Sequence, residues 1–124
     1  MLIDTHINVH GEDYANDLDS VLDAARDAGV SPMIAICCRL HEFEQVAAIA
    51  EKHDDVYCTI GAHPHHAKDR PDITADELLD IARHPKVVAI GEIGLDYYYD
   101  NADREVQREV FRRQLQIACD TNRP

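Results

Sequence analysis

The amino-acid sequence predicts an α/β protein built around a parallel β-sheet. Short apolar runs rich in β-branched residues alternate four times with segments that have the periodicity of an amphipathic helix. The connections between these runs are too short for anything except right-handed parallel crossovers. Polar clusters follow the first, third and fourth runs, at the sheet edge where parallel α/β folds place their functional sites.

The composition is that of one acidic domain. The chain has 124 residues, of which 45% are hydrophobic, which is enough for one core and too few for two. No apolar run approaches the roughly 20 residues of a membrane span, and the N-terminus lacks a basic segment followed by a long apolar one. We therefore expect a single domain over residues 1–124, a cytoplasmic location and no contact with a membrane.

Charge and cysteine usage narrow the classes of partner. The net charge of -12 argues against nucleic-acid binding through a generic basic face, so a nucleic-acid substrate would need bound cations. The four cysteines show no CxxC spacing, and three of them lie in apolar runs. We interpret them as reduced thiols of the core.

The first half of the chain contains two strand–helix units. Residues 2–3 open a short strand that runs into the polar segment 4–10. One apolar stripe predicts a helix over residues 14–28, and Gly29 is placed to end it at the C′ position. A second buried strand is predicted at residues 33–38. It is followed by a helix over residues 41–53 whose inward side chains are Phe43, Val46, Ala47 and Ala50.

The second half repeats this pattern. Residues 56–60 predict a third strand, which ends in a histidine-rich loop at residues 61–66 (GAHPHH). Thr74 and Glu77 have the spacing of a capping box, so we expect a helix to begin there and to continue through Ala82. The apolar run at residues 87–90 predicts the fourth strand, and residues 103–121 predict the last helix.

The fourth predicted strand delivers Glu92 to the edge of the sheet. A carboxylate beside a buried strand is costly unless a cation or hydrogen-bond donors meet it. Metal binding or proton transfer is therefore one interpretation of Glu92. A capped or salt-bridged structural glutamate is the other.

The first predicted strand ends in a second polar pattern, residues 4–8 (DTHIN). Its period-two spacing points His6 and Asn8 to the same side, so both can approach one ion. Neutral imidazole is the commonest metal ligand, and an asparagine carbonyl is a weaker oxygen ligand. A capped loop with exposed histidines is the alternative. Because the three polar clusters share the carboxyl rim of the sheet, their convergence favours a metal site.

Three segments carry a resemblance to a known family: residues 4–8 (DTHIN), 61–65 (GAHPH) and 89–97 (AIGEIGLDY), followed by Gln107, Phe111 and Gln114. With these segments the chain resembles the TatD metal-dependent nucleases of the amidohydrolase superfamily. The resemblance implies a TIM-type (β/α)8 barrel, of which this chain would be the first four βα units, a half-barrel. It also implies one or two divalent ions (Mg, Mn or Zn) and hydrolysis of DNA phosphodiester bonds, in which the ions activate water and neutralise phosphoryl charge.

The same resemblance gives roles to individual residues. His6, Asn8 and Glu92 would be metal ligands, with Glu92 placed to bridge two ions. Glu92 and His63 would be the catalytic residues, and His63 and His65 would face the substrate. Many family members carry a second histidine where this chain has Asn8. Further strand-end ligands of the family, two histidines and an aspartate, belong to its fifth, sixth and eighth strands.

Two functions from different classes remain open. The first is a TatD-type metal-dependent hydrolase that reaches DNA through bound metal. The second is a catalytically inactive half-barrel that serves as a binding or regulatory module. Four parallel strands leave two open edges and an uncovered apolar face, so a homodimer that completes the half-barrel is also expected. The side chains assigned to that face are Ile34, Ile36, Ile60 and Val88.

Overall fold

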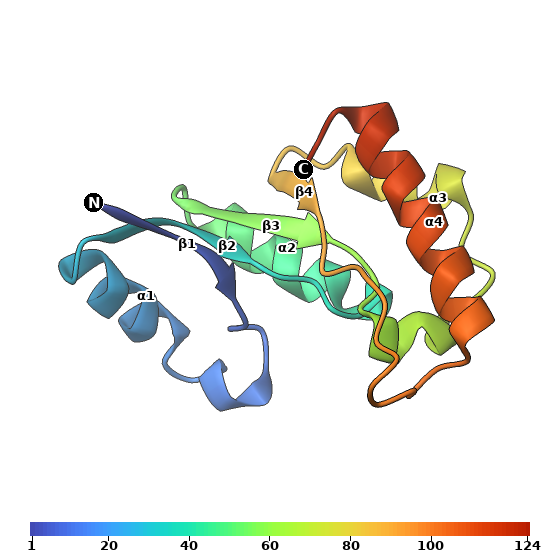
Figure 1. Ribbon diagram of the computed structural model, residues 1–124. Coiled ribbons are helices and arrows are strands. Elements are labelled where there is room, and N and C mark those ends of the chain that lie inside the picture. Colours follow the sequence, from blue (N-terminus) through green and yellow to red (C-terminus); the bar gives the residue numbers. More distant parts are fainter.

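The computed structural model describes every residue from Met1 to Pro124 and contains one parallel sheet (Figure 1). Its strands lie in the order of the chain: β1 (Leu2–Ile7), β2 (Val30–Ala35), β3 (Val56–Ile60) and β4 (Val87–Ile90). The helices that alternate with them are α1 (Leu18–Asp27), α2 (Phe43–Lys52), α3 (Ala75–Ala82) and α4 (Arg104–Thr121). None of the helices combines the length and the apolar character needed to cross a membrane.

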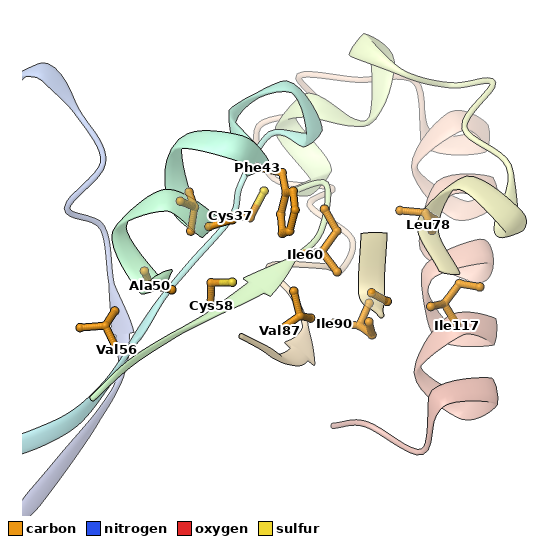
Figure 2. Packing of buried hydrophobic residues seen from close by; sticks show 14 of the residues in the cluster. Cys37, Phe43, Ala50, Val56, Cys58, Ile60, Leu78, Val87, Ile90 and Ile117 are labelled. Carbon is orange, nitrogen blue, oxygen red and sulfur yellow. The ribbon is translucent and has the colours of Figure 1, made fainter. Parts of the chain in front are cut away.

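One face of the sheet carries the core, and all four helices contribute to it. Figure 2 shows core side chains from α2, α3 and α4. Alternate residues of β3 are fully buried on this face, as the period of two requires. They join one apolar cluster with side chains from each helix, including Leu22, Phe43, Leu78 and Ile117. Full burial of such a side chain contributes about 1.5–3 kcal/mol. A sequential strand order with the helices packed on one face is the arrangement of a half-barrel, as predicted.

Several predicted elements are confirmed together with their end signals. The third and fourth strands have the predicted ranges. Thr74 and Glu77 form the predicted capping box: Thr74 Oγ1 accepts a hydrogen bond from the Glu77 N–H, and Glu77 Oε2 accepts one from the Thr74 N–H. Gly29 follows α1 with a φ of 82°, the left-handed conformation that favours glycine.

Other boundaries were predicted wrongly. The first helix begins at Leu18 rather than at residue 14, because residues 12–14 form a separate 3-10 turn and Asp17 is the N-cap. The second strand spans Val30–Ala35 rather than 33–38, since Cys37 leaves the ladder to bond the Thr59 side chain. Short 3-10 turns also occupy Leu40–Glu42, before α2, and Pro64–Asp69, within the histidine-rich loop.

The other face of the sheet bears an open hollow of about 360 Å³. Ile34 and Ile36 line it, as predicted. The assignment of Ile60 to this face was wrong: Ile60 is fully buried beneath the helices, because it alternates with Thr59, which does line the hollow. Val88 is partly buried and lies outside the lining, at a shift in register between β3 and β4.

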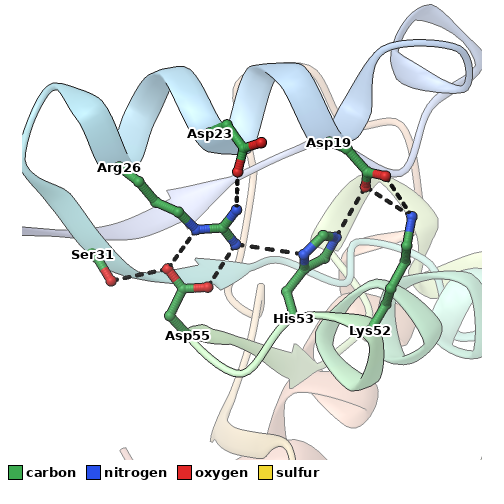
Figure 3. Close-up of polar contacts among 7 residues, drawn as sticks. All are labelled: Asp19, Asp23, Arg26, Ser31, Lys52, His53 and Asp55. Carbon is green, nitrogen blue, oxygen red and sulfur yellow. Dashed lines mark hydrogen bonds and ion pairs between the residues drawn. The ribbon is translucent and has the colours of Figure 1, made fainter.

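A network of charged side chains joins α1 to the amino ends of β2 and β3 (Figure 3). Arg26 donates to Asp55 from Nε (2.9 Å) and from Nη2 (2.7 Å), and to Asp23 from Nη1 (2.6 Å). The Ser31 hydroxyl donates to Asp55 at 3.0 Å. The hydrogen bonds from Arg26, and then that from Ser31, hold the pKa of Asp55 well below its usual value. Asp55 is therefore ionised and closely paired.

Candidate metal site

Glu92 is the centre of a cluster at the carboxyl ends of the strands. Its Oε2 lies 3.6 Å from Nε2 of His6, in β1, and its Oε1 lies 3.4 Å from Nε2 of His63, just after β3. The Glu92 side chain is 34% exposed, so the cluster is open to solvent. The predicted approach of His6, His63 and Glu92 is therefore confirmed.

The backbone of Glu92 is fixed by the two central strands. The Glu92 N–H donates to the Cys37 carbonyl at 3.0 Å, and the Gly91 N–H donates to the Ile60 carbonyl at 2.9 Å. The Thr59 hydroxyl connects both segments, because it donates to the Gly91 carbonyl at 2.5 Å and accepts from the Cys37 N–H at 3.1 Å. These bonds hold the carboxylate at the rim without using its own oxygens.

Gly61 explains why a glycine opens the GAHPH segment. A Cβ at position 61 would lie 2.5 Å from the carbonyl carbon of Gly91 and 2.9 Å from the nitrogen of Glu92. Real Cβ atoms do not approach backbone atoms so closely. The absence of a side chain at Gly61 thus allows the segment with Glu92 to pack against the end of β3.

His63 is held in one orientation and one protonation state. The backbone N–H of His63 donates to the Cys38 carbonyl at 2.9 Å. The ring Nδ1 of His63 accepts from the backbone N–H of His65 at 3.1 Å. The proton of the neutral ring is therefore assigned to Nε2, the atom that faces Glu92. Burial lowers the pKa of His63, and the nearby Glu92 carboxylate opposes this effect without overcoming it. His63 is neutral at pH 7.

Two buried glutamines of α4 fix the loops that carry the site. Gln114 bonds both backbone groups of Ala62, accepting from its N–H at 2.6 Å and donating to its carbonyl at 3.3 Å. Gln107 bonds both backbone groups of Asp96 in the same way, at 2.8 and 3.0 Å. Each glutamine is 1% exposed. The sequence signal was a polar residue repeated after seven positions on the apolar side of a helix, but it did not reveal these partners.

His65 lies beside His63 and is paired with an acid. Its Nε2 is 2.5 Å from Asp96 Oδ2, and its ring meets that of His63 edge to face with centroids 4.4 Å apart. The N–H groups of Tyr99 and Tyr98 donate to Asp96 Oδ1. The bond from Tyr99, followed by the contact with His65, lowers the pKa of Asp96. His65 is thus oriented at the rim by a carboxylate.

Asn8 reaches the cluster through Cys38, which the sequence interpretation had treated only as a core thiol. Cys38 Sγ lies 3.6 Å from Glu92 Oε2 and 3.9 Å from Asn8 Oδ1. Burial, and then the charge of Glu92, raise the pKa of Cys38 to about 12, so the group is a protonated thiol at pH 7. The available signal was its place at the end of the second apolar run, on the same rim as the other clusters.

The sequence matches the family profile of TatD-related DNases over residues 3–124. The chain belongs to this family. It is 35% identical to the uncharacterized metal-dependent hydrolase YabD of Bacillus subtilis, over 100% of this chain and 49% of YabD. It is 38% identical to the 3'-5' ssDNA/RNA exonuclease TatD of Erwinia tasmaniensis, over 99% of this chain and 48% of that protein.

A solved structure shows the same relation. The crystal structure of YJJV, a TatD homologue from Escherichia coli K12, matches with a TM-score of 0.89 and 32% identity, over 99% of this chain and 48% of that chain. The chain therefore spans about half the length of the relatives it matches. Its fold is half of a TIM barrel, and the family identified from the sequence motifs is confirmed.

The relative YabD is named as a metal-dependent hydrolase, and the donor atoms of the cluster suit a divalent ion. Glu92 offers carboxylate oxygens, His6 an imidazole nitrogen and Asn8 an amide oxygen, a set compatible with Mg²⁺, Mn²⁺ or Zn²⁺. No three His, Cys, Asp or Glu side chains are arranged as ligands of one ion. His6, Asn8 and Glu92 together would give an ion three protein ligands. This ligation stays a prediction.

Proposed function

We propose that this chain forms the metal-binding half of a divalent-metal-dependent deoxyribonuclease that hydrolyses DNA phosphodiester bonds. The observation that carries the proposal is the convergence of His6 and His63, from two different strand ends, on the carboxylate of Glu92. Membership of the TatD-related family and the printed names of two relatives, a metal-dependent hydrolase and an exonuclease, support it.

In this proposal His6, Asn8 and Glu92 hold the ion. When bound, the ion would lower the pKa of a water molecule and neutralise charge on the phosphoryl oxygens. His63 is neutral and its Nε2–H lies at the rim beside Glu92, from where it would donate a hydrogen bond to a phosphate oxygen or a water next to the ion. His65, oriented by Asp96, is the second group that faces the substrate. Since the net charge is -12, bound cations are the route by which DNA approaches.

A second candidate function is a catalytically inactive half-barrel that acts as a binding or regulatory module. The observation that favours it is that no three His, Cys, Asp or Glu side chains are arranged around one ion. Such a site would bind metal more weakly than a fuller ligand set, and a second ion would find few ligands. This candidate predicts binding without turnover.

A nuclease assay separates the two candidates. We expect the chain to hydrolyse DNA in Mn²⁺ or Mg²⁺ and to lose this activity in excess chelator. Glu92→Gln removes the ligand charge and should lower the rate by at least about 100-fold, because even outer partners of metal ligands are worth 10- to 100-fold. Glu44→Gln, at the exposed start of α2, is the matched control and should retain the activity.

Two results of these assays would contradict the proposal or favour the second candidate. Activity that persists in excess chelator, or that survives in Glu92→Gln, would contradict a metal-dependent mechanism at this site. Metal binding by the wild-type chain with no hydrolysis of single-stranded or duplex DNA would favour the inactive binding module.

We also propose that a second copy of the chain covers the hollow face of the sheet. The hollow is lined by apolar side chains that include Ile34 and Ile36, and the edge strand β1 exposes Leu2 and Ile3. Open strand edges and exposed apolar surface both promote association. Sedimentation equilibrium should show a dimer, and Ile34→Asp should shift it to monomer. A wild-type chain that stays monomeric at all concentrations would contradict this proposal.

A cytoplasmic location completes the proposal. The four cysteines are free thiols, and two of them, Cys37 and Cys58, are fully buried. Burial raises the pKa of Cys37 to about 11 and that of Cys58 to about 12, so both are unreactive. Unpaired thiols are typical of a reducing compartment. Cell fractionation that places the chain outside the cytoplasm would contradict this assignment.

A further inference from the structure

Three consecutive tyrosines are exposed on the loop between β4 and α4. Tyr98 is 87% exposed, Tyr99 65% and Tyr97 39%. Aromatic rings dominate binding energetics because each can bury about 150–250 Å² of surface. None of these three rings belongs to the proposed metal ligands or to the histidines that face the substrate. Their exposure is therefore not explained by that site.

The loop presents the rings in a fixed arrangement. The N–H groups of Tyr98 and Tyr99 donate to Asp96 Oδ1 at 2.9 and 3.0 Å, and Gln107 of α4 holds the backbone of Asp96. The rings of Tyr98 and Tyr99 meet at 86° with centroids 4.8 Å apart. The Tyr97 ring packs under Arg104, whose Cζ lies 4.7 Å from the ring centroid. A surface ordered before binding loses little conformational entropy when a ligand arrives.

The rings are continuous with the candidate metal site. The Tyr99 ring meets the His65 ring edge to face with centroids 5.6 Å apart. His65 meets His63 in the same way at 4.4 Å, and His63 Nε2 lies 3.4 Å from Glu92. A row of planar groups therefore leads from the Glu92 carboxylate to Tyr98 at the outer end of the rim.

A pocket with basic side chains lies along this row. Its volume is about 450 Å³, and His65 forms part of its wall. Arg39 and Lys68 bring positive charge to the lining, in a chain that has only 12 lysines and arginines against 24 acids. Asp69 also lines the pocket and faces His66 at 3.5 Å, so it offsets part of that charge.

We propose that Tyr98 and Tyr99 form a stacking platform for the unpaired bases of a single-stranded nucleic acid, with a neighbouring phosphate held in the pocket of Arg39 and Lys68. Base faces stack on aromatic rings with little dependence on sequence, while basic side chains follow the backbone. Paired bases in a duplex do not expose their faces to such a platform. The inference rests on the proposed nuclease function. What it adds is the residues that would contact the bases and the phosphate, since a single-stranded substrate is already printed in the name of the Erwinia tasmaniensis relative.

Fluorescence anisotropy with a short phosphorothioate oligothymidylate in Mg²⁺ tests the platform, because this probe resists hydrolysis. The double substitution Tyr98→Ala with Tyr99→Ala should weaken binding about 5- to 150-fold. The corresponding double Tyr→Phe variant keeps both rings and should bind like the wild type, which separates stacking from a loss of fold. Leu115→Ala, which truncates an exposed apolar side chain on α4, is the control for general surface effects.

An abasic oligomer of the same length separates bases from phosphates. We expect it to bind more weakly than oligothymidylate and to be insensitive to both alanine substitutions. Lys68→Gln should weaken the binding of the two oligomers by the same factor, since it removes a phosphate contact only.

Three results would overturn the inference: unchanged oligothymidylate affinity in the double alanine variant, the same tyrosine dependence for duplex DNA, or a change in oligomeric state in place of a change in affinity. Different results would contradict the nuclease function and leave the platform intact. If hydrolysis of an ordinary oligonucleotide is never detected but tyrosine-dependent binding persists, the platform stands and the nuclease function falls. If hydrolysis depends on Glu92 and binding ignores the tyrosines, the reverse holds.

Discussion

The two ends of the sheet use similar side chains for different purposes. At the amino ends, the Arg26 guanidinium donates to Asp55 at 2.7 and 2.9 Å, within the range of strong charge-assisted hydrogen bonds. At the carboxyl ends, the Glu92 carboxylate meets two imidazole nitrogens at 3.4 and 3.6 Å, which is longer than a good hydrogen bond. The Asp55 carboxylate is therefore fully paired with its partners, whereas the Glu92 carboxylate can still bind a ligand.

The way each end is held explains this difference. At the amino ends the charged groups themselves connect α1 to β2 and β3. At the rim, Gln107 and Gln114 hold backbone groups, and Gly61 allows close packing of the segment that carries Glu92. The Glu92 carboxylate is therefore positioned through the backbone, and its oxygens remain available to a ligand. In barrel folds the carboxyl ends carry activity and the amino ends carry stability, which is the division that the proposed metal site would follow here.

Gly61→Ala should have the largest effect, because it disturbs both packing and the site. The added Cβ meets backbone atoms of Gly91 and Glu92. Backbone atoms cannot move aside as the end of a flexible side chain can. We expect a loss of about 1–3 kcal/mol in the free energy of unfolding, measured by denaturant titration, together with weaker Mn²⁺ binding. Gly11→Ala, where a Cβ meets open space, is the control. Equal behaviour of the two variants would show that the contact at Gly61 does not position Glu92.

Arg26→Ala should lower the stability of the fold without changing metal binding, and it therefore distinguishes the roles of the two ends of the sheet. It leaves Asp55 without its guanidinium partner, so we expect the free energy of unfolding to fall by about 1–2 kcal/mol. Metal binding at the distant rim should stay unchanged. Arg112→Ala removes an exposed pair with Glu109 on α4 and should cost nothing measurable. A loss of metal affinity in Arg26→Ala would contradict the division between the ends.

The acid dependence of stability should depend on Asp55. Its pKa is depressed in the folded state, so its contribution is complete above its ordinary pKa of about 4 and is lost as the pH falls through the lower folded value. The stability difference between wild type and Asp55→Asn should therefore be about 1 kcal/mol at pH 7 and should shrink below about pH 4. Urea titrations at several pH values measure it. A difference independent of pH would mean that ionic pairing contributes nothing there.

Asp19→Asn should have the smallest effect. Asp19 pairs with Lys52 at 2.7 Å and lies 3.3 Å from His53 Nε2, but its side chain is 60% exposed (Figure 3). Water and salt screen such a pair. We expect no measurable change in the urea midpoint. A clear loss would extend the stabilising network of the amino end beyond Arg26 and Asp55.

The parts of the fold that the sequence predicted best are those with strong local signals. β3 and β4 are apolar runs bounded by glycine, proline or acidic residues, and their ranges were correct. The rule that parallel strands end at one rim, together with the barrel-like curvature expected of the sheet, predicted that His6, His63 and Glu92 approach one another. The period-two spacing of residues 4–8 paired Asn8 with His6 as a candidate ligand, and the family resemblance added the half-barrel.

The missed features depend on contacts between segments that are distant in the sequence. Cys38 touches Glu92 across 54 positions, and Gln114 bonds Ala62 across 52. Neither partner follows from composition or period. Ile60 was assigned to the open face, although its alternation with Thr59 places it on the same face as Val56 and Cys58. Which of the two faces the helices cover is decided by packing.

Calorimetric titration with Mn²⁺ tests the central claim most directly, namely that Glu92 is a metal ligand and Asp55 a structural partner. A carboxylate holds a hard divalent ion far better than an amide does. We predict that the wild type and Asp55→Asn bind Mn²⁺ with the same affinity, and that Glu92→Gln binds it at least about ten-fold more weakly while unfolding at the same urea concentration. Unchanged Mn²⁺ affinity in Glu92→Gln would contradict the account.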